Sequence, residues 1–201
     1  SLGWALQQKS DGTANAVAAA RSALRGFQGH LLIVAGDVPL MRSETLRAFV
    51  DTVTQNGGRG GVITVEQEDP TGYGRIVRNG TGMVEAIIEE SDADAQTKQI
   101  HEINTGIFCV DAKWLFQVLG KVGTANAQRE CYLTDIAQLA QVEGTGLLPF
   151  KASDPEEFLG VNSRVELAQA EAIIDNKSGS GPFVLNEYQR GNVYRVSKDP
   201  N

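Results

Sequence analysis

An aspartate that directly follows a short apolar run is the residue in this sequence best placed to do chemistry. Residues 31–35 read Leu-Leu-Ile-Val-Ala, a run typical of a buried parallel strand, and Gly36 and Asp37 come next. Ligands of open α/β sheets bind beyond the carboxyl ends of the strands, where a carboxylate can hold a hard cation. A glycine there lets a ligand approach the backbone closely. A plain turn, with Asp37 capping the next segment, explains the same pattern equally well.

Other polar residues could also bind a ligand. Residues 69–75 (Asp-Pro-Thr-Gly-Tyr-Gly-Arg) form a turn-rich stretch whose backbone groups can face a ligand, although an ordinary loop is the commoner explanation. Glu85 and Glu89 alternate onto one face of an expected strand, where a carboxylate can bind sugar hydroxyls but more often belongs to a solvated face. Asn104 offers a donor and an acceptor. Asn162 stands at an expected helix start, where an N-cap is the commoner role.

Several familiar catalytic centres are missing from the sequence. It contains no Gly-x-Ser-x-Gly nucleophile motif, no Walker loop and no Gly-x-Gly-x-x-Gly before an expected helix. His30 and His101 have no metal-ligand spacing with each other or with Cys109 and Cys131. Two cysteines make no disulfide framework, so we expect reduced thiols and a cytoplasmic protein.

Charge and hydrophobicity exclude two classes of partner. Among 201 residues, 18 Lys and Arg stand against 25 Asp and Glu, which gives a net charge of −7, and 41% of the residues are hydrophobic. These values are typical of a globular protein. An acidic chain is poorly suited to a nucleic-acid backbone, and no apolar run approaches the roughly 18 residues that span a bilayer. We therefore expect neither a nucleic-acid nor a membrane partner.

Helical and strand-like segments alternate, which favours an α/β sheet covered by helices on both faces. Expected strands cover residues 4–7, 31–35, 61–66, 73–78, 83–89, 105–110 and 147–150, and expected helices begin near residues 13, 43, 112, 134 and 162. The Ser-Gly-Ser-Gly of residues 178–181 is typical of a flexible linker, and no strong period follows it. We therefore divide the chain into a partial domain over residues 1–177 and a linker with an unassigned tail over residues 178–201.

A series of short motifs, taken in order, resembles one enzyme family. The motifs are Gln7, Gly12-Thr13-Ala14, Gly36-Asp37-Val38-Pro39-Leu40, residues 69–76, Glu89, Glu102-Ile103-Asn104-Thr105-Gly106, Tyr132-Leu133-Thr134-Asp135 and Gly160-Val161-Asn162-Ser163-Arg164. Over about residues 4–174 they resemble the uridylyltransferase domain of bacterial N-acetylglucosamine-1-phosphate uridylyltransferase, which in that family is joined to a glucosamine-1-phosphate acetyltransferase domain. The resemblance implies an α/β, Rossmann-like nucleotidyltransferase fold with a mixed, mainly parallel sheet.

The resemblance also implies a role for each matching residue. The nucleotide would be held by Gln7, Gly12, Thr13, Ala35, Gly36 and Asp37, and the sugar by Gly74, Glu89, Asn104 and Asn162. Mg²⁺ would be coordinated by Asp37 and Asn162. The implied reaction joins UTP and N-acetylglucosamine 1-phosphate to give UDP-N-acetylglucosamine and pyrophosphate. A nucleotidyltransferase for another sugar 1-phosphate and a non-catalytic sugar-nucleotide binding module stay as alternatives.

The sequence also departs from the family pattern. It has neither the N-terminal Gly-rich loop whose Arg and Lys hold the triphosphate nor the hexapeptide-repeat β-helix of the acetyltransferase domain. Residue 91 is Ser where the family usually has a basic residue, and Ala35 stands where it often has an aromatic one. Because each fixed donor contributes about 3 kcal/mol to transition-state stabilisation, we expect very low or no activity from these residues alone. Without the β-helix we expect no trimer.

Overall fold

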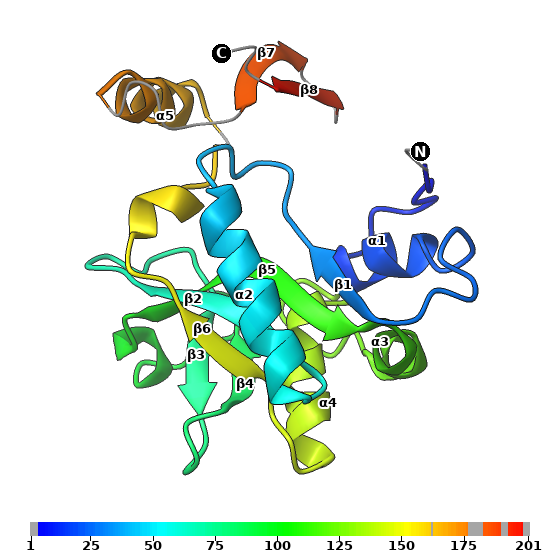
Figure 1. The fold of residues 1–201 in the computed structure, drawn as a ribbon. Helices are drawn as coiled ribbons and strands as arrows, with labels where there is room; N and C mark the ends of the chain where they lie inside the picture. Colours follow the sequence, from blue (N-terminus) through cyan, green and yellow to red (C-terminus); the bar gives the residue numbers. More distant parts are fainter. Residues whose placement is uncertain (1–3, 162, 177–182, 190–192, 199–201) are drawn as a thin grey trace. The chain divides into compact units, whose positions relative to one another are not determined.

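A computed structural model of the chain describes residues 4–161, 163–176, 183–189 and 193–198 (Figure 1). The chain divides into two compact units. The first comprises Ser1–Val34 and Phe49–Ser153, and the second comprises Ala35–Ala48 and Asp154–Asn201. Within the described residues, no helix is long and apolar enough to cross a membrane.

The first unit is built on a six-stranded sheet. Its strands are β1 (His30–Ile33), β2 (Gly60–Glu66), β3 (Arg75–Arg78), β4 (Val84–Ile88), β5 (Glu102–Asp111) and β6 (Leu148–Lys151). The strand order is β4-β3-β5-β2-β6, and β1 also pairs with β5. The mixed sheet is confirmed, but the expectation of mainly parallel pairing is wrong, because only β2 and β6 run parallel among these described pairs. The long strand β5 takes β1, β2 and β3 as antiparallel neighbours.

The apolar run that precedes Gly36 forms a different strand from the one expected. It is antiparallel to β5, with His30 opposite Asp111 and Ile33 opposite Phe108, and Leu32 is 40% exposed. The expectation of a buried parallel strand is therefore wrong. An apolar run reports hydrophobicity but not strand direction, and among the described residues β1 pairs on one side only, with β5.

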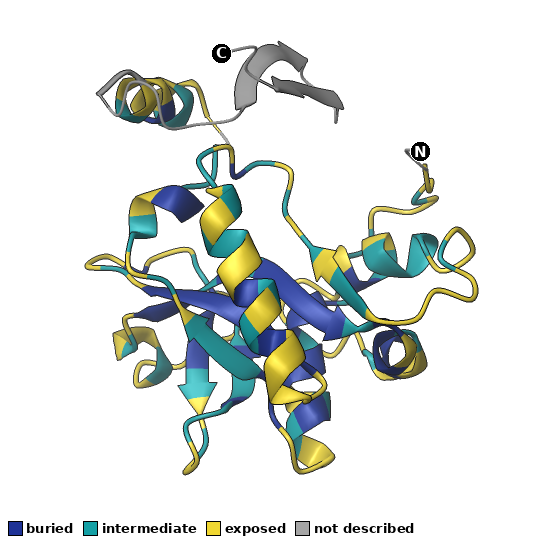
Figure 2. Cartoon of the chain, viewed as in Figure 1, coloured by how far each residue is buried: buried dark blue, intermediate teal, exposed yellow. Residues whose placement is uncertain are grey.

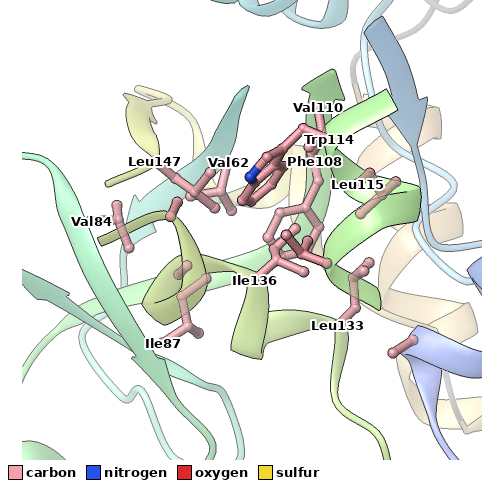
Figure 3. Close-up of a cluster of buried hydrophobic side chains, with 14 of the residues drawn as sticks. Val62, Val84, Ile87, Phe108, Val110, Trp114, Leu115, Leu133, Ile136 and Leu147 are labelled. Atoms are coloured by element: carbon pink, nitrogen blue, oxygen red, sulfur yellow. The ribbon is translucent and has the colours of Figure 1, made fainter. Parts of the chain in front are cut away.

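One face of the sheet carries the main core. The helices α3 (Ala112–Val118) and α4 (Ile136–Val142) pack there, and Figure 3 shows their side chains converging with those of the sheet. Helix α3 starts where it does because the Asp111 carboxylate accepts a hydrogen bond of 2.7 Å from the Trp114 N–H. The residues of this core that Figure 3 labels are Val62, Val84, Ile87, Phe108, Val110, Trp114, Leu115, Leu133, Ile136 and Leu147.

The opposite face carries the C-terminal part of α2 (Ser43–Asn56), which belongs to this unit from Phe49 onward and lies in front of the sheet in Figure 1. Its Phe49 and Val53 are fully buried, whereas its outer side is exposed (Figure 2). Gly61 of β2 leaves room for this contact, because a Cβ there would lie 2.8 Å from Val53 Cγ2. Gly61 and the core residue Val62 are adjacent on one strand and so point to opposite faces. Helices on both faces of the sheet are thus confirmed.

The remaining elements are short or belong to the second unit. Residues 4–7, expected as a strand end, have no regular structure, and α1 (Thr13–Ala19) follows them. Three 3₁₀ turns cover Thr97–Gln99, Leu119–Lys121 and Leu133–Asp135. The second unit contains a 3₁₀ turn (Pro155–Phe158), α5 (Arg164–Asn176) and the antiparallel strands β7 (Phe183–Gln189) and β8 (Val193–Lys198). The expected linker of residues 178–181 lies outside the described residues.

Candidate functional site

The turn before α1 is clamped onto a distant segment of the chain. Gly12 has φ +116°, and a Cβ on it would lie 2.3 Å from the Cys131 carbonyl oxygen, so only glycine fits. The Ala14 N–H donates to that same carbonyl at 2.9 Å. The Thr13 hydroxyl accepts a hydrogen bond of 2.9 Å from the Leu133 N–H. Four backbone and side-chain groups thus fix this turn, which carries two of the residues expected to bind the nucleotide.

Gln7 belongs to the same cluster. Its side-chain Nε2 donates to the Gly12 carbonyl at 3.2 Å, and the side chain is half-buried. The structure therefore brings together Gln7, Gly12 and Thr13, which the sequence places on two sides of a polar turn. Their role in holding a uracil base stays a prediction.

Glu89 lies just after β4 and carries a half-buried carboxylate. The buried Thr134 hydroxyl donates to its Oε1 at 3.0 Å. Burial raises the pKa of Glu89 above its ordinary value; the Thr134 hydrogen bond opposes that rise, and the nearby charges of Asp92 and Asp135 add to it. Further hydrogen bonds from hydroxyl donors stabilise a partly buried carboxylate that has no cation beside it, and a sugar supplies such donors.

Gly74, which is also expected to bind the sugar, lies against Glu89, and Asn104, the remaining expected sugar residue of this unit, is joined to Gly74. The Asn104 N–H donates to the Gly74 carbonyl at 2.8 Å. A Cβ on Gly74 would lie 3.3 Å from Glu89 Oε2 and 3.2 Å from Ile87 Cγ2, so the loop backbone is packed closely on the carboxylate. The Asn104 side-chain Oδ1 already accepts from the Gly106 N–H at 2.9 Å. The three residues form one cluster.

Residues 131–134 join the two clusters of the first unit. Leu133 bonds to Thr13, and its neighbour Thr134 bonds to Glu89. Thr134 belongs to one of the sequence motifs but was assigned no role, and Cys131 was considered as a reduced thiol and not as part of the site. No local sequence signal marks these contacts, because each joins residues that are far apart in the chain.

Ala35, Gly36 and Asp37 belong to the second unit. There the Asp37 carbonyl accepts a hydrogen bond of 2.8 Å from the Val161 N–H. Asn162, the other expected metal ligand, lies outside the described residues, although its neighbour Val161 is held beside Asp37. The Asp37 carboxylate is half-buried and makes no hydrogen bond or ion pair with any described residue.

An ion-pair cluster that the sequence analysis missed holds the same two segments of the second unit. Glu157 is buried, with Oε1 2.8 Å from the Arg42 guanidinium and Oε2 accepting from the Arg42 backbone N–H at 3.2 Å. Asp154 binds the same guanidinium. Arg42 follows the Asp37 loop and Glu157 precedes Val161. This cluster therefore connects the same two segments as the Val161–Asp37 hydrogen bond. A surface arginine and an ordinary acidic turn give no sequence signal of such pairing.

Comparison with solved structures defines the class of fold. The chain superposes on a putative glucose-1-phosphate thymidylyltransferase from Bacillus anthracis with a TM-score of 0.61 and 22% identity, over 83% of this chain and 62% of the other. It superposes on an apo UDP-glucose pyrophosphorylase with a TM-score of 0.64 and 14% identity, over 85% of this chain and 62% of the other. The chain therefore shares the fold of these two solved proteins.

Sequence comparison then gives the family. A family model described as nucleotidyl transferase matches residues 1–154, and the chain belongs to that family. The relatives include the bifunctional protein GlmU of Corynebacterium diphtheriae, 47% identical over 86% of this chain and 36% of the relative. The bifunctional protein GlmU of Enterococcus faecalis is 41% identical over 98% of this chain and 42% of the relative. The chain thus spans about two fifths of the length of these relatives.

Proposed function

We propose that this chain supplies the nucleotide and sugar subsites of a Mg²⁺-dependent uridylyltransferase that joins UTP and N-acetylglucosamine 1-phosphate. The products would be UDP-N-acetylglucosamine and pyrophosphate. The observation that carries the proposal is the continuous set of contacts from Gln7 and Gly12, through residues 131–134, to Glu89 and Gly74. Family membership supports a nucleotidyl transfer reaction, and the motif resemblance supports this pair of substrates.

The nucleotide end of the site offers the groups that a uracil ring requires. Uracil presents two carbonyl acceptors and one N–H donor, and the Gln7 amide carries both a donor and an acceptor. The Gly12–Thr13 turn is held rigid by its contacts with Cys131 and Leu133. A rigid turn loses little conformational entropy when it binds a ligand, which favours recognition of a flat base.

The sugar end of the site suits an N-acetylated hexose. The Glu89 carboxylate accepts hydroxyl protons, and the Asn104 side-chain NH₂ makes no hydrogen bond with a described residue and can donate to a ligand carbonyl. The close packing of Gly74 on Glu89 leaves the loop backbone next to the carboxylate. Hydroxyl and acetamido groups would therefore meet acceptors and donors within one cluster.

The reaction itself needs no general base in this site. The attacking group is a phosphate monoester, whose second pKa is about 6, so it is already largely anionic near neutral pH. Catalysis then depends on holding two anions in line and on neutralising charge at the α-phosphorus. This requirement agrees with a site whose described residues include no His or Cys constellation.

Asp37 and Asn162 are the residues that we expect to hold Mg²⁺. A Mg²⁺ ion favours oxygen ligands and keeps several waters, so one carboxylate and one amide oxygen beside substrate phosphates are enough. The Asp37 carboxylate fits this role because it has no partner among the described residues and is half-buried. The bound ion would supply charge neutralisation at the phosphates. The chain's own contribution is to keep the Asp37 and Val161 backbones together.

Equilibrium binding of nucleotide sugars tests this function. Isothermal titration of the chain with UDP-N-acetylglucosamine, UDP-glucose and UMP, each with Mg²⁺, compares ligands that share the uridine. We expect UDP-N-acetylglucosamine to bind at least about tenfold more tightly than UDP-glucose, which corresponds to about 1.4 kcal/mol. A preference for UDP-glucose would support a different sugar 1-phosphate as substrate. Failure of every uridine ligand to bind would overturn the proposal.

A further inference from the structure

Glu90 is the centre of a charge network beside the proposed sugar subsite. Its Oε2 lies 2.7 Å from the Arg75 guanidinium and accepts a long hydrogen bond of 3.4 Å from the Gly72 N–H. Its Oε1 lies 3.2 Å from Lys98 Nζ. Arg75 in turn donates to the Tyr73 carbonyl. One carboxylate thereby holds Gly72 and Arg75, the residues on either side of Tyr73 and Gly74.

The burial of Arg75 shows that this anchoring is a strong constraint. Its side chain is only 2% exposed, and a buried guanidinium is unfavourable unless it is paired and hydrogen-bonded. Arg75 finds that compensation in Glu90 and the Tyr73 carbonyl, while its Nε has no partner among the described residues. If the loop moved away, Arg75 would lose one of the two partners that compensate its burial. Hydrogen bonds from Lys98 and then Arg75 also keep the pKa of Glu90 below its ordinary value.

The anchored loop is the one that carries Gly74. Glu89 and Glu90 are adjacent and have separate partners: Glu89 accepts from Thr134, and Glu90 holds the loop. Gly74 belongs to the loop that Glu90 holds, and its Cα packs closely against the Glu89 carboxylate. The Gly74 carbonyl accepts a hydrogen bond from the Asn104 N–H. The position of the loop therefore sets the spacing among the three residues of the proposed sugar cluster.

We propose that Arg75 and Glu90 are positioning residues of the sugar subsite, which fix the loop of residues 72–74 against Glu89 and so determine affinity for the sugar. This inference rests on the proposed function. It concerns groups that do not touch the ligand themselves, and it predicts an effect on sugar recognition with none on uridine recognition.

The first test measures the loop without any ligand. Amide hydrogen exchange of Gly72 and Tyr73 is followed by NMR in the full chain and in Glu90→Gln. We expect exchange of both amides to accelerate at least about tenfold in the variant, because the neutral amide weakens the contacts with Arg75 and Lys98. Glu85→Gln is the matched control, since Glu85 lies on β4 and its side chain makes no hydrogen bond or ion pair with a described residue. Unchanged exchange in Glu90→Gln would overturn the inference.

The second test measures binding of UDP-N-acetylglucosamine and UMP to the same chains. We expect Glu90→Gln to lower the affinity for UDP-N-acetylglucosamine at least fivefold (about 1 kcal/mol) and to leave the affinity for UMP within about twofold of that of the unaltered chain. A general loss of structure would weaken both ligands. If the unaltered chain binds no UDP-N-acetylglucosamine, the proposed function fails, and the exchange experiment still decides whether Glu90 anchors the loop. If the unaltered chain binds it and Glu90→Gln binds equally well, the inference fails alone.

A second variant protects the test against misfolding. Lys98 is 46% exposed, and Lys98→Gln removes one partner of Glu90 without touching the buried Arg75. We expect it to fold normally and to show the same pattern more weakly, with a loss of sugar-nucleotide affinity of about twofold to threefold and unchanged UMP affinity. Equal affinity for both ligands in Lys98→Gln and in the unaltered chain, together with unchanged loop exchange, would contradict the proposed role of Glu90.

Discussion

The backbone N–H of Val161 donates a hydrogen bond of 2.8 Å to the carbonyl of Asp37. This bond joins two loops of the second unit, one that follows the apolar run of residues 31–35 and one that leads into α5. It brings the neighbour of Asn162 next to Asp37, although well over a hundred residues separate them. The pair of expected Mg²⁺ ligands therefore belongs to segments that the backbone itself holds together.

Replacement of Asp37 tests the expected metal site. We expect Asp37→Asn to weaken Mn²⁺ binding at least about tenfold, as measured by electron paramagnetic resonance, because an oxygen ligand with full negative charge is lost. Since the carboxylate has no partner among the described residues, the free energy of unfolding should stay within about 0.5 kcal/mol. Asp51→Asn, at an exposed position of α2, is the control. Unaltered Mn²⁺ affinity in Asp37→Asn would mean that another group holds the metal.

Gly12 should tolerate no side chain. A Cβ would meet the Cys131 carbonyl at 2.3 Å, and φ +116° is unfavourable for any other residue. We expect Gly12→Ala to lower the free energy of unfolding by more than about 1 kcal/mol in urea titrations. Gly58→Ala is the control, because no atom lies within 4 Å of a Cβ placed there and its φ is not positive. Equal free energies of unfolding in the two variants would contradict the close backbone contact between Gly12 and Cys131.

The charge state of Glu89 should make stability depend on pH in a defined direction. Because burial raises its pKa in the folded chain, its contribution to stability is present at low pH and is lost as pH rises through the folded pKa. Glu89→Gln cannot lose a proton, so its free energy of unfolding relative to the unaltered chain should increase between about pH 4 and about pH 8. Urea titrations followed by tryptophan fluorescence measure this difference. A constant difference across the range would show that the folded pKa of Glu89 is not raised.

Glu157 should stabilise the pairing of the two loops in the second unit. Glu157→Gln weakens the contacts with the Arg42 guanidinium and N–H, and hydrogen bonds to charged groups contribute about 1.5–3 kcal/mol each. We expect faster amide exchange at Val161, measured by NMR, because Glu157 and Arg42 tie the same segments. Arg47→Gln, at an exposed position whose side chain makes no hydrogen bond or ion pair with a described residue, should leave that rate unchanged. If Val161 shows the same amide exchange rate in both variants, the ion pair of Glu157 and Arg42 does not stabilise the Asp37 loop.

The sequence predicted elements best where local signals agree. Helix α2 was expected to begin near residue 43, and it covers Ser43–Asn56, because a polar start and an apolar stripe coincide and Gly57 follows the last turn. The direction and exposure of β1 could not be predicted, since hydrophobicity does not say which strand will be the neighbour. Residues 4–7 resembled a strand end by composition alone and form no strand.

The candidate site was predicted only in its parts. The residues themselves came from short motifs, whereas the contacts that join them connect distant positions, such as Gly12 with Cys131 and Glu89 with Thr134. Arginine side chains are mostly exposed in folded proteins, so the burial of Arg75 could not be predicted from the sequence either. The structure adds the contacts through which these separate motifs are joined into one site.

NMR mapping of UDP-N-acetylglucosamine on the ¹⁵N-labelled chain, with UMP as the companion ligand, tests the joint nucleotide–sugar site most directly. We expect UMP to shift the amide signals of Gly12 and Thr13. The sugar nucleotide should shift these signals and also those of Gly74, Glu89 and Asn104. Shifts confined to other parts of the first unit, or identical shifts with both ligands, would contradict a joint nucleotide–sugar site at these residues.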